Sequence, residues 1–327
     1  MQSSAWLATL SSAAGVRSLI VLSGNLNDIY ADGNDWRALP ELLHRTLLAR
    51  GFDQVLFWDR AAGAQCFERG ALGPCPSAVM ERLLSCRAPA DSSGEDYAID
   101  LPTQAATPDP LREPEQFFAA VQQRLADGGT ERWAFVIDWA NLLFGNANSL
   151  SEQERQWMLR LGTGLRGMKA GLDGLERPAH TLLFLCPRNV TLPPLFLQAQ
   201  ALTREIAVPV PSRAEREAYL KSRYPHLRLR KPLRPGTPDF DNLVDLLDGM
   251  SLRDVHALIR LSQREPGEPL SAERLLNLYR HGEQRSPWEE LSRDKLAGIV
   301  EELGRSVKGQ DDAVQKLSRI VRRAYTG

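Results

Sequence analysis

Short apolar runs alternate with amphipathic stretches over the first two thirds of the chain. The runs are apolar at nearly every position instead of every second one, which is typical of strands covered on both faces. They are Ser18–Leu22, Val55–Trp58, Trp133–Asp138, Thr181–Cys186 and Glu205–Val210. Because strands and helical stretches take turns, the pattern predicts an α/β fold with a five-stranded parallel sheet sandwiched by helices.

Helical spacing fills the gaps between these runs and dominates the rest of the chain. Between the strands it covers Trp36–Arg50, Glu115–Asp127, Ser151–Ala170 and Thr191–Ala201. After Val210 only helices are predicted, at Ser212–Tyr224, Phe240–Leu247, Leu252–Gln263, Ala272–His281 and Asp311–Tyr325. Ser212-x-x-Glu215 and Ser286-Pro287-Trp288-Glu289 are capping-box patterns, which place helix starts at these two points.

This organisation predicts three parts: an α/β domain over residues 1–211, a small all-helical lid domain over 212–284, and a helical linker over 285–327. Residues 71–114 are rich in Pro, Ala, Ser and Thr and acidic on balance. We expect them to leave the sheet as an excursion, with one or two helical turns at Glu81–Cys86.

Composition narrows the class of protein. A formal net charge of −1 over 327 residues argues against strong non-specific binding to DNA. No apolar run approaches the length of a membrane span, and the first residues lack a signal-peptide pattern, so we expect a cytoplasmic location and no membrane partner. The four cysteines show neither C-x-x-C spacing nor nearby histidines, which favours buried or incidental thiols over a disulfide or a metal site.

The ends of the predicted strands are the places where a parallel sheet binds ligands. The first strand leads into Ser23–Asp28, which lacks the glycines and lysine of a phosphate-binding loop, so Gly24 is predicted to be a turn glycine. The third ends at Asp138, where many nucleotide hydrolases hold magnesium. Trp139 follows instead of a second acid, and an indole cannot accept a proton from water. The alternative is that Asp138 only caps the turn.

In their order along the chain these features resemble the AAA+ ATPase superfamily. Asp138 takes the place of the Walker-B acid, Asn189 follows the fourth strand as a sensor-1-like residue, and Asp239–His281 resembles the family's helical lid. Asp248–Asp254 lies where many members carry G-x-S-x-x-[DE], which makes Arg253 a candidate contact. Taken alone, Asn189 is also an ordinary turn residue.

A second resemblance lies near the end of the chain. Val307-Lys308-Gly309-Gln310-Asp311 and the Arg-rich helix after it resemble the opening of a Clp-type unfoldase module, whose V-x-G-Q turn lines the adenine pocket. In that family a phosphate-binding loop follows this helix, and the sequence stops at Gly327, before such a loop. We therefore expect this chain to be the amino-terminal portion of a longer protein; the alternative is an ordinary amphipathic helix.

Together the resemblances imply a degenerate first module with no catalytic residue, in a longer protein that is an AAA+ ATPase. The cofactor-binding residues they imply are Asp138, Asn189, Arg253, Val307 and Gly309. They imply no cofactor in this chain, a protein partner or substrate, and, in the full-length protein, ATP, Mg²⁺ and a homo-oligomer that can be a hexamer. Arg188 and Arg204 are candidates for an arginine finger, and slow hydrolysis at an unorthodox site is the enzymatic alternative.

A basic stretch runs from Arg213 to Arg234, with eight basic and two acidic residues and interleaved rings at Tyr219, Tyr224 and His226. Basic residues alternating with rings are typical of single-stranded nucleic-acid surfaces. Contact with an acidic protein surface and a plain solvated helix face are the other two interpretations, and the sequence leaves all three open.

Overall fold

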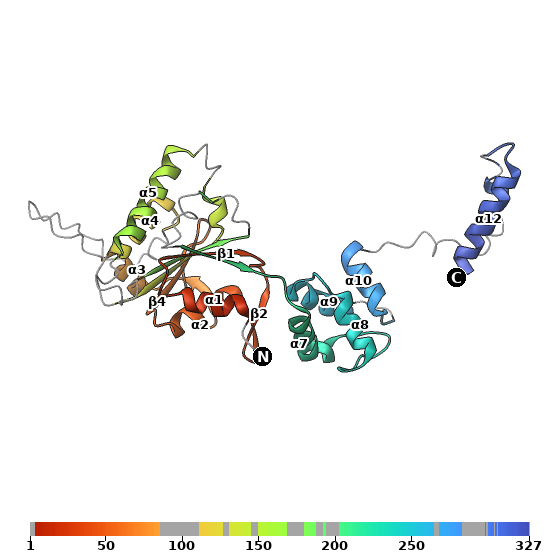
Figure 1. Cartoon of the computed structure of the whole chain (residues 1–327), viewed down its shortest axis with the longest axis horizontal. Helices are drawn as coiled ribbons and strands as arrows, with labels where there is room; N and C mark the ends of the chain where they lie inside the picture. Colours follow the sequence, from red (N-terminus) through yellow and green to blue (C-terminus); the bar gives the residue numbers. More distant parts are fainter. Residues whose placement is uncertain are drawn as a thin grey trace, which may run out of the picture. The chain divides into compact units, whose positions relative to one another are not determined.

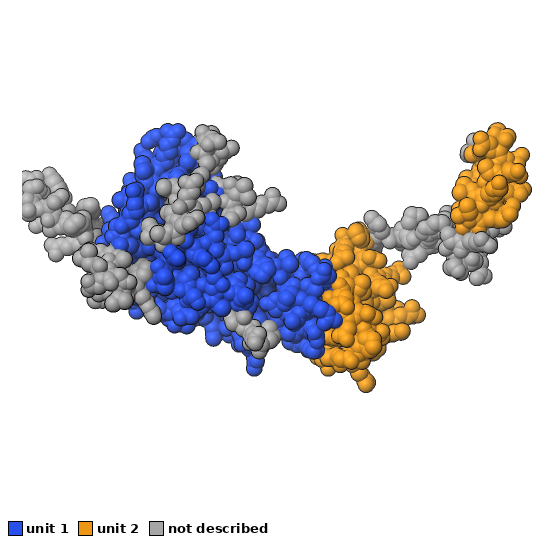
Figure 2. Space-filling view, in the orientation of Figure 1, with its two compact units in different colours: residues 1–222, 247–256 blue, residues 223–246, 257–327 orange. Residues whose placement is uncertain are grey.

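The computed structural model describes residues 4–85, 111–126, 131–144, 150–168, 180–187, 192–193, 203–264, 268–282, 298, 300–303, 305 and 307–326. The chain divides into two compact units, shown in different colours in Figure 2. Unit 1 comprises residues 1–222 and 247–256, and unit 2 comprises residues 223–246 and 257–327. We describe each unit by itself. The three-domain division expected from the sequence stays a prediction.

Unit 1 is built on a seven-stranded sheet in the order β6-β5-β4-β7-β8-β1-β9. The strands are β1 (Leu19–Gly24), β4 (Gln54–Asp59), β5 (Gly63–Glu68), β6 (Ala71–Pro74), β7 (Trp133–Ile137), β8 (Thr181–Cys186) and β9 (Thr203–Val208). The five predicted strands pair in parallel, and β5 and β6 add an antiparallel edge next to β4. The α/β prediction is confirmed, but five strands was too few, because β5 and β6 lack the continuous apolar runs that marked the others.

Helices cover both faces of this sheet (Figure 1). On one side lie α1 (Ala5–Ala13) and α2 (Leu39–Ala49), and on the other α3 (Ser77–Leu84), α4 (Pro114–Ala126) and α5 (Glu152–Gly167). Successive strand residues point to opposite faces, so Leu19 and Val21 pack with the α3–α5 side while Ile20 and Leu22 pack with the α1–α2 side. This two-sided burial explains the unbroken apolar runs.

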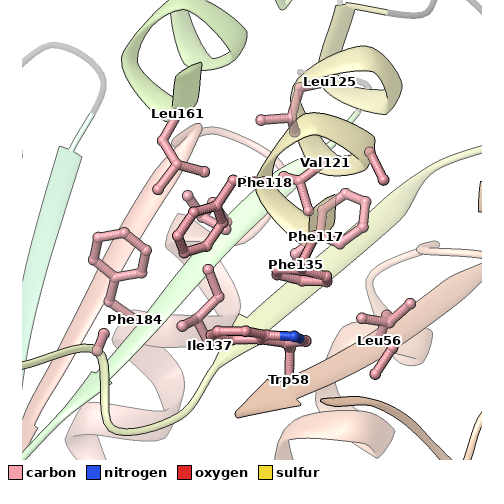
Figure 3. Packing of buried hydrophobic residues seen from close by; sticks show 14 of the residues in the cluster. Leu56, Trp58, Phe117, Phe118, Val121, Leu125, Phe135, Ile137, Leu161 and Phe184 are labelled. Carbon is pink, nitrogen blue, oxygen red and sulfur yellow. The ribbon is translucent and has the colours of Figure 1, made fainter. Parts of the chain in front are cut away.

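Aromatic rings fill the core beneath α4 and α5 (Figure 3). Trp58 of β4 stacks on Phe117 of α4 with ring centroids 4.6 Å apart, and its indole N–H donates to the carbonyl oxygen of Leu111 at 2.8 Å. Phe118 makes an edge-on contact with Trp157 of α5. These contacts pack α4 against β4 and α5 against α4.

A two-stranded hairpin separates β1 from α2. Its strands are β2 (Ile29–Asp32) and β3 (Asp35–Ala38), paired antiparallel. The helix predicted over 36–50 therefore begins later, at Leu39, with Pro40 in its first turn, where proline is favoured. Arg37 donates to Asp32 at 2.7 Å, which ties the hairpin together.

The expectation of an excursion over 71–114 is wrong at its beginning. Residues 71–74 form the edge strand β6, and α3 buries Val79, Met80 and Leu83 in the core. These three residues follow helical spacing, which the surrounding Pro, Ala and Ser obscure. Residues 86–110 lie outside the described residues.

The expectation of unpaired thiols is also wrong for two cysteines, because Cys66 and Cys75 form a disulfide. Cys66 lies on β5 opposite Gly73 of β6, and Cys75 directly follows that strand. The hairpin brings together two cysteines whose nine-residue separation matches no sequence motif. Cys186 is a buried free thiol, as expected, and burial raises its pKa to about 12.

The described part of the chain beyond residue 208 contains helices and no strand, as predicted. The helices are α7 (Arg213–Arg223), η3 (Tyr224–His226), α8 (Pro238–Leu246), α9 (Leu252–Arg264), α10 (Ala272–His281) and α12 (Asp311–Thr326). The predicted helix 191–201 and the capping box at Ser286 lie outside the described residues. Within the described ranges no helix has both the length and the apolar character needed to cross a bilayer.

Candidate functional site

A cavity of about 590 Å³ opens in unit 1 beside the carboxyl ends of β1 and β9. Its walls come from the start of α1, the turn after β1, strand β2, the turn before α7 with the first turn of that helix, and the first residue of α9. Trp6 and Leu252 supply apolar surface, while Asn25, Asp28 and Glu215 supply polar atoms. Chain segments far apart in the sequence therefore enclose one hollow at the edge where α/β sheets bind ligands.

Asp28 is the most deeply buried polar residue of this cavity, with 1% of its surface exposed. Its Oδ2 accepts the side-chain amide of Asn25 at 2.7 Å. Its Oδ1 accepts the main-chain N–H groups of Ile29 and Arg253, each at 2.8 Å. Three N–H donors thus satisfy the buried carboxylate, which would otherwise be costly to remove from water.

Tyr30 lies beside this cluster, and its hydroxyl donates to the main-chain carbonyl oxygen of Asn25. Burial raises the pKa of the Tyr30 phenol, so the hydroxyl keeps its proton and its role as a donor. The ring meets Trp6 edge-on, with centroids 5.4 Å apart. The two aromatic residues form a fixed apolar wall next to the polar cluster.

The main-chain N–H groups in the turn after β1 donate hydrogen bonds to carbonyl oxygens of the protein itself. The N–H groups of Gly24, Asn25 and Leu26 donate to the carbonyl oxygens of Pro187, Val208 and Gly24, at 3.3, 2.9 and 2.9 Å. Gly24 has a φ of +95°, and a Cβ there would lie 2.5 Å from the Val208 oxygen. Gly24 is thus a turn glycine packed against β9, as predicted, and these three N–H groups are engaged within the protein.

The chain direction after this turn also differs from that of a phosphate-binding loop. In such a loop the strand leads directly into a helix, whose N-terminus attracts the anion. Here β1 is followed by the β2–β3 hairpin, and α2 begins only at Leu39. The Ser23–Asp28 turn therefore presents no helix N-terminus of its own to the cavity.

Asp138 follows β7 and lies outside the cavity wall. Its main-chain N–H donates to the Trp58 oxygen at 2.9 Å, and its Oδ1 accepts the Trp139 N–H at 2.7 Å. Burial raises the pKa of the Asp138 carboxyl and the nearby Asp59 adds to the rise, while the Trp139 bond opposes it. The bond to Trp139 is the one that a turn-capping role requires, and a role in holding magnesium stays a prediction.

Arg253 occupies the first turn of α9, and its main-chain N–H is the group that meets Asp28. The motif around it forms a capping box: the Asp254 N–H donates to Ser251 Oγ at 3.0 Å, and the Ser251 N–H to Asp254 Oδ2 at 3.2 Å. The G-x-S-x-x-D pattern thus has a local structural role. Binding by the Arg253 side chain stays a prediction.

The remaining predicted site residues that the structure describes do not line this cavity. Val307 and Gly309 belong to unit 2 and do not line it. Asn189 and Arg188 lie outside the described residues, and Arg204 is an exposed residue of β9. Among the described residues chosen from the sequence, Arg253 contacts the cavity-lining Asp28 through its main-chain N–H, and its charge acts to lower the pKa of Tyr30.

Two residues of the basic stretch 213–234 are buried and hydrogen-bonded within unit 1. Arg216 is only 4% exposed and donates to the Pro211 oxygen at 2.7 Å and to Asp248 at 2.6 Å. Tyr219 is buried and hydrogen-bonded to His256 at 2.8 Å. These two residues are therefore unavailable to a nucleic acid, and a surface contact falls to the exposed basic residues of the stretch, such as Arg213 and Arg230.

The fold and the cavity together define a Rossmann-like α/β protein, with a mostly parallel sheet between two helical layers. Residues 2–209 match the family described as "AAA+ chaperone, N-terminal Rossmann-like domain", and the chain belongs to this family. The resemblance to the AAA+ superfamily is thereby confirmed. The match does not test the Clp-type second module.

Two further comparisons describe the relatives of the chain. No curated protein matches it. Among solved structures, it is similar to a chain in the "Structure of E. coli MS115-1 HORMA:CdnC:Trip13 complex", at 14% sequence identity and a TM-score of 0.43. That similarity covers 84% of this chain and 77% of the other.

Sequence reasoning overlooked Asp28, Tyr30 and Trp6 as site residues. Asp28 closes a polar turn directly after a buried strand, which is a usable signal for a residue at a strand end. Trp6 and Tyr30 carried no such signal, because aromatic residues are common in any core. Only the folded chain shows that they share one wall.

Proposed function

We propose that this chain is a non-hydrolysing AAA+ module that serves assembly, partner docking or regulation in a longer, Clp-like, ATP-dependent protein-remodelling ATPase. The observation that carries the proposal is the closed turn after β1. Since the N–H groups of Gly24, Asn25 and Leu26 already donate to carbonyl oxygens, they cannot cradle a phosphate without breaking those bonds.

Two carboxylates in the cavity wall support the same proposal. Asp28 and Glu215 both line it, and a triphosphate would bring further negative charge close to these carboxylates. Like charges a few ångströms apart repel strongly in a partly buried site. These two carboxylates disfavour a polyphosphate, while the helix starts in the wall and the charge of Arg253, which reaches Tyr30, act in the opposite direction.

The end of β7 supports the absence of hydrolysis. Trp139 stands where the resemblance calls for a second acid, and its indole cannot act as a general base. Its backbone adopts the left-handed conformation, with a φ of +52°, which is uncommon for a residue other than glycine. In this proposal ATP and Mg²⁺ act in the module downstream, after the Val307–Gln310 motif.

Calorimetry with ATP·Mg²⁺, together with a phosphate-release assay on the same sample, tests the proposal. We expect neither heat of binding at millimolar nucleotide nor release above the protein-free rate. Trp139→Glu restores a carboxylate at the missing position and is expected to stay inactive, because the turn after β1 is unchanged. Micromolar affinity for ATP in the wild-type chain would overturn the proposal.

A further inference from the structure

The part of the basic stretch that lies in unit 2 carries positive charge without a counter-charge. Earlier in the stretch, Arg213 and Lys221 both pair with Glu217, and the buried Arg216 binds Asp248. Residues 223–234, which we call the basic loop, contain no acid. Its five cations are exposed and make no ion pair within the described ranges: Arg223, Arg228, Arg230, Lys231 and Arg234. A surface of this kind attracts polyanions.

Main-chain hydrogen bonds hold the basic loop against the rest of unit 2. The Arg228 N–H donates to Ser262 Oγ at 3.1 Å, and the Arg230 N–H donates to the Leu270 oxygen at 2.9 Å. Leu229, between the two arginines, is only 9% exposed. The backbone is thus fixed on its inner side while both guanidinium groups face solvent, which lowers the entropic cost of binding a ligand.

Exposed rings occur in the same loop. Tyr224 is 36% exposed, and His226 is exposed two positions later. Rings next to free cations are typical of surfaces that bind single-stranded nucleic acids, where the rings stack on bases and the cations bind phosphates. Tyr219, the other tyrosine of the basic stretch, is buried and takes no part.

A pocket of about 430 Å³ adjoins the basic loop, and we call it the α8 pocket. Arg230 and Lys231 line it on the side of the loop. Asp239 and Asn242 of α8 and Glu273 of α10 supply further polar atoms. Apolar surface comes from Leu229, Leu243 and Leu246. Two cations and two carboxylates therefore lie around one apolar hollow.

This mixture of charges distinguishes between polyanions. An acidic peptide would bring its carboxylates close to Asp239 and Glu273, which repel them. A nucleotide instead carries its negative charge on the phosphate and presents N–H donors at the edge of its base. Carboxylates accept from the amino group of cytosine, and asparagine pairs with adenine, while apolar side chains suit the flat faces of a base. The cations of the basic loop suit the phosphate.

We infer that the α8 pocket binds an amino-bearing base of a single-stranded nucleic acid, whose phosphates contact Arg228, Arg230 and Lys231. A single strand is required, because a base stacked inside a duplex cannot enter a pocket. This binding goes beyond the proposed function and does not depend on it, since all of the residues involved belong to unit 2.

Fluorescence anisotropy of the whole chain with labelled oligo(dC) and oligo(dT) of equal length tests the inference. Both strands carry the same charge, but thymine lacks an amino group. We expect oligo(dC) to bind at least about fivefold more tightly. Absence of binding to either strand, or equal affinity for both, would overturn the inference.

The phosphate contacts are tested by Arg228→Ala combined with Arg230→Ala. We expect affinity for both strands to fall by about tenfold or more, and the slope of log affinity against log salt to flatten by about 1.4, since each phosphate contact contributes about 0.7. The control combines Arg60→Ala with Arg166→Ala, two exposed arginines of unit 1, which changes the net charge equally and should leave binding unchanged. Equal losses in both double variants would show only general attraction and would refute the site.

The pocket is tested by Asp239→Ala combined with Glu273→Ala, with circular dichroism to verify folding. If the carboxylates accept from the base, affinity for oligo(dC) falls to that for oligo(dT). If they only repel phosphates, affinity for both strands rises, which contradicts the inference. Displacement of oligo(dC) by polyglutamate at equal charge would identify an acidic protein as the occupant and also contradict it. Phosphate release from ATP is independent of these outcomes, so the proposed lack of hydrolysis is judged separately.

Discussion

The carboxylate of Asp28 accepts the main-chain N–H of Arg253 at 2.8 Å, although 225 positions separate the two residues. An anionic group of the protein thereby lies at the N-terminus of α9, where the helix dipole favours negative charge. The same carboxylate binds Asn25 and Ile29. Asp28 consequently joins the turn after β1 to residues 247–256 without any ligand.

Replacing Asp28 tests this connection. Asp28→Ala removes the acceptor of three N–H groups, and a bond to a charged group is worth about 1.5–3 kcal/mol. We expect the free energy of unfolding to fall by at least about 2 kcal/mol, measured by urea denaturation. Asp35→Ala is the control, because the Asp35 side chain is 70% exposed and should cost well under half as much. Equal losses would show that Asp28 makes no special contribution.

Gly24 provides a test of the closed turn. In Gly24→Ala the new methyl group lies 2.5 Å from the Val208 oxygen, and the alanine must also adopt a positive φ. Gly33→Ala carries only the conformational cost, about 1–2 kcal/mol, because nothing lies within 4 Å of its Cβ. Thermal unfolding should therefore show a clearly larger loss for Gly24→Ala. The packing of β1 against β9 would be in doubt if the two variants were equally stable.

The disulfide between Cys66 and Cys75 closes a short loop at the edge of the sheet. A loop of this length restricts the unfolded chain by about 2–3 kcal/mol in the chain-entropy description. The double variant Cys66→Ser, Cys75→Ser should lose this stability. Dithiothreitol should lower the melting temperature of the wild type and leave that of the double variant unchanged. A wild-type melting temperature insensitive to the reductant would contradict the pairing.

Asp138 gives the chain a predictable pH dependence. Burial raises the pKa of the Asp138 carboxyl above its unfolded value of about 3.9. At pH values between these two pKa values, the folded chain keeps a proton that the unfolded chain has released. Its contribution to stability is therefore complete below about pH 3.9 and is lost as the pH rises through the folded pKa.

Asp138→Asn removes this titration and keeps an oxygen acceptor for the Trp139 N–H. Relative to the wild type, the variant should gain stability as the pH rises from 4 to 7, as measured by urea denaturation at each pH. Glu68→Gln, at an exposed position on β5, is the control and should show no comparable change. A relative stability of Asp138→Asn that falls over this range would refute the assignment.

The sheet was predictable where strands are buried on both faces. The apolar runs of β1, β4, β7, β8 and β9 mark such strands directly, because each residue in them meets one helical layer or the other. The edge strands β5 and β6 and the β2–β3 hairpin face solvent more and mix polar with apolar residues, so their periodicity is weak. These strands are stabilised by antiparallel pairing with their neighbours, β4 with β5, β5 with β6, and β2 with β3.

For the candidate site, the sequence established what is missing. Ser23–Asp28 lacks the glycines and the lysine of a phosphate loop, and Trp139, not a second acid, follows Asp138; both features can be read directly from the sequence. It also placed Arg253 at the beginning of a helix and Gly24 in a turn. These are local properties, set by spacing along the chain and by the conformational preferences of single residues.

The contacts that shape the cavity required the folded chain. Asp28 with Arg253, Trp6 with Tyr30, and Cys66 with Cys75 are pairs whose members carry no mark of each other in the sequence. Local pattern records whether a position faces the core, but not which distant segment it meets there. That choice follows from strand order and from the packing of helices on the sheet, where the energy of each contact depends on all the others.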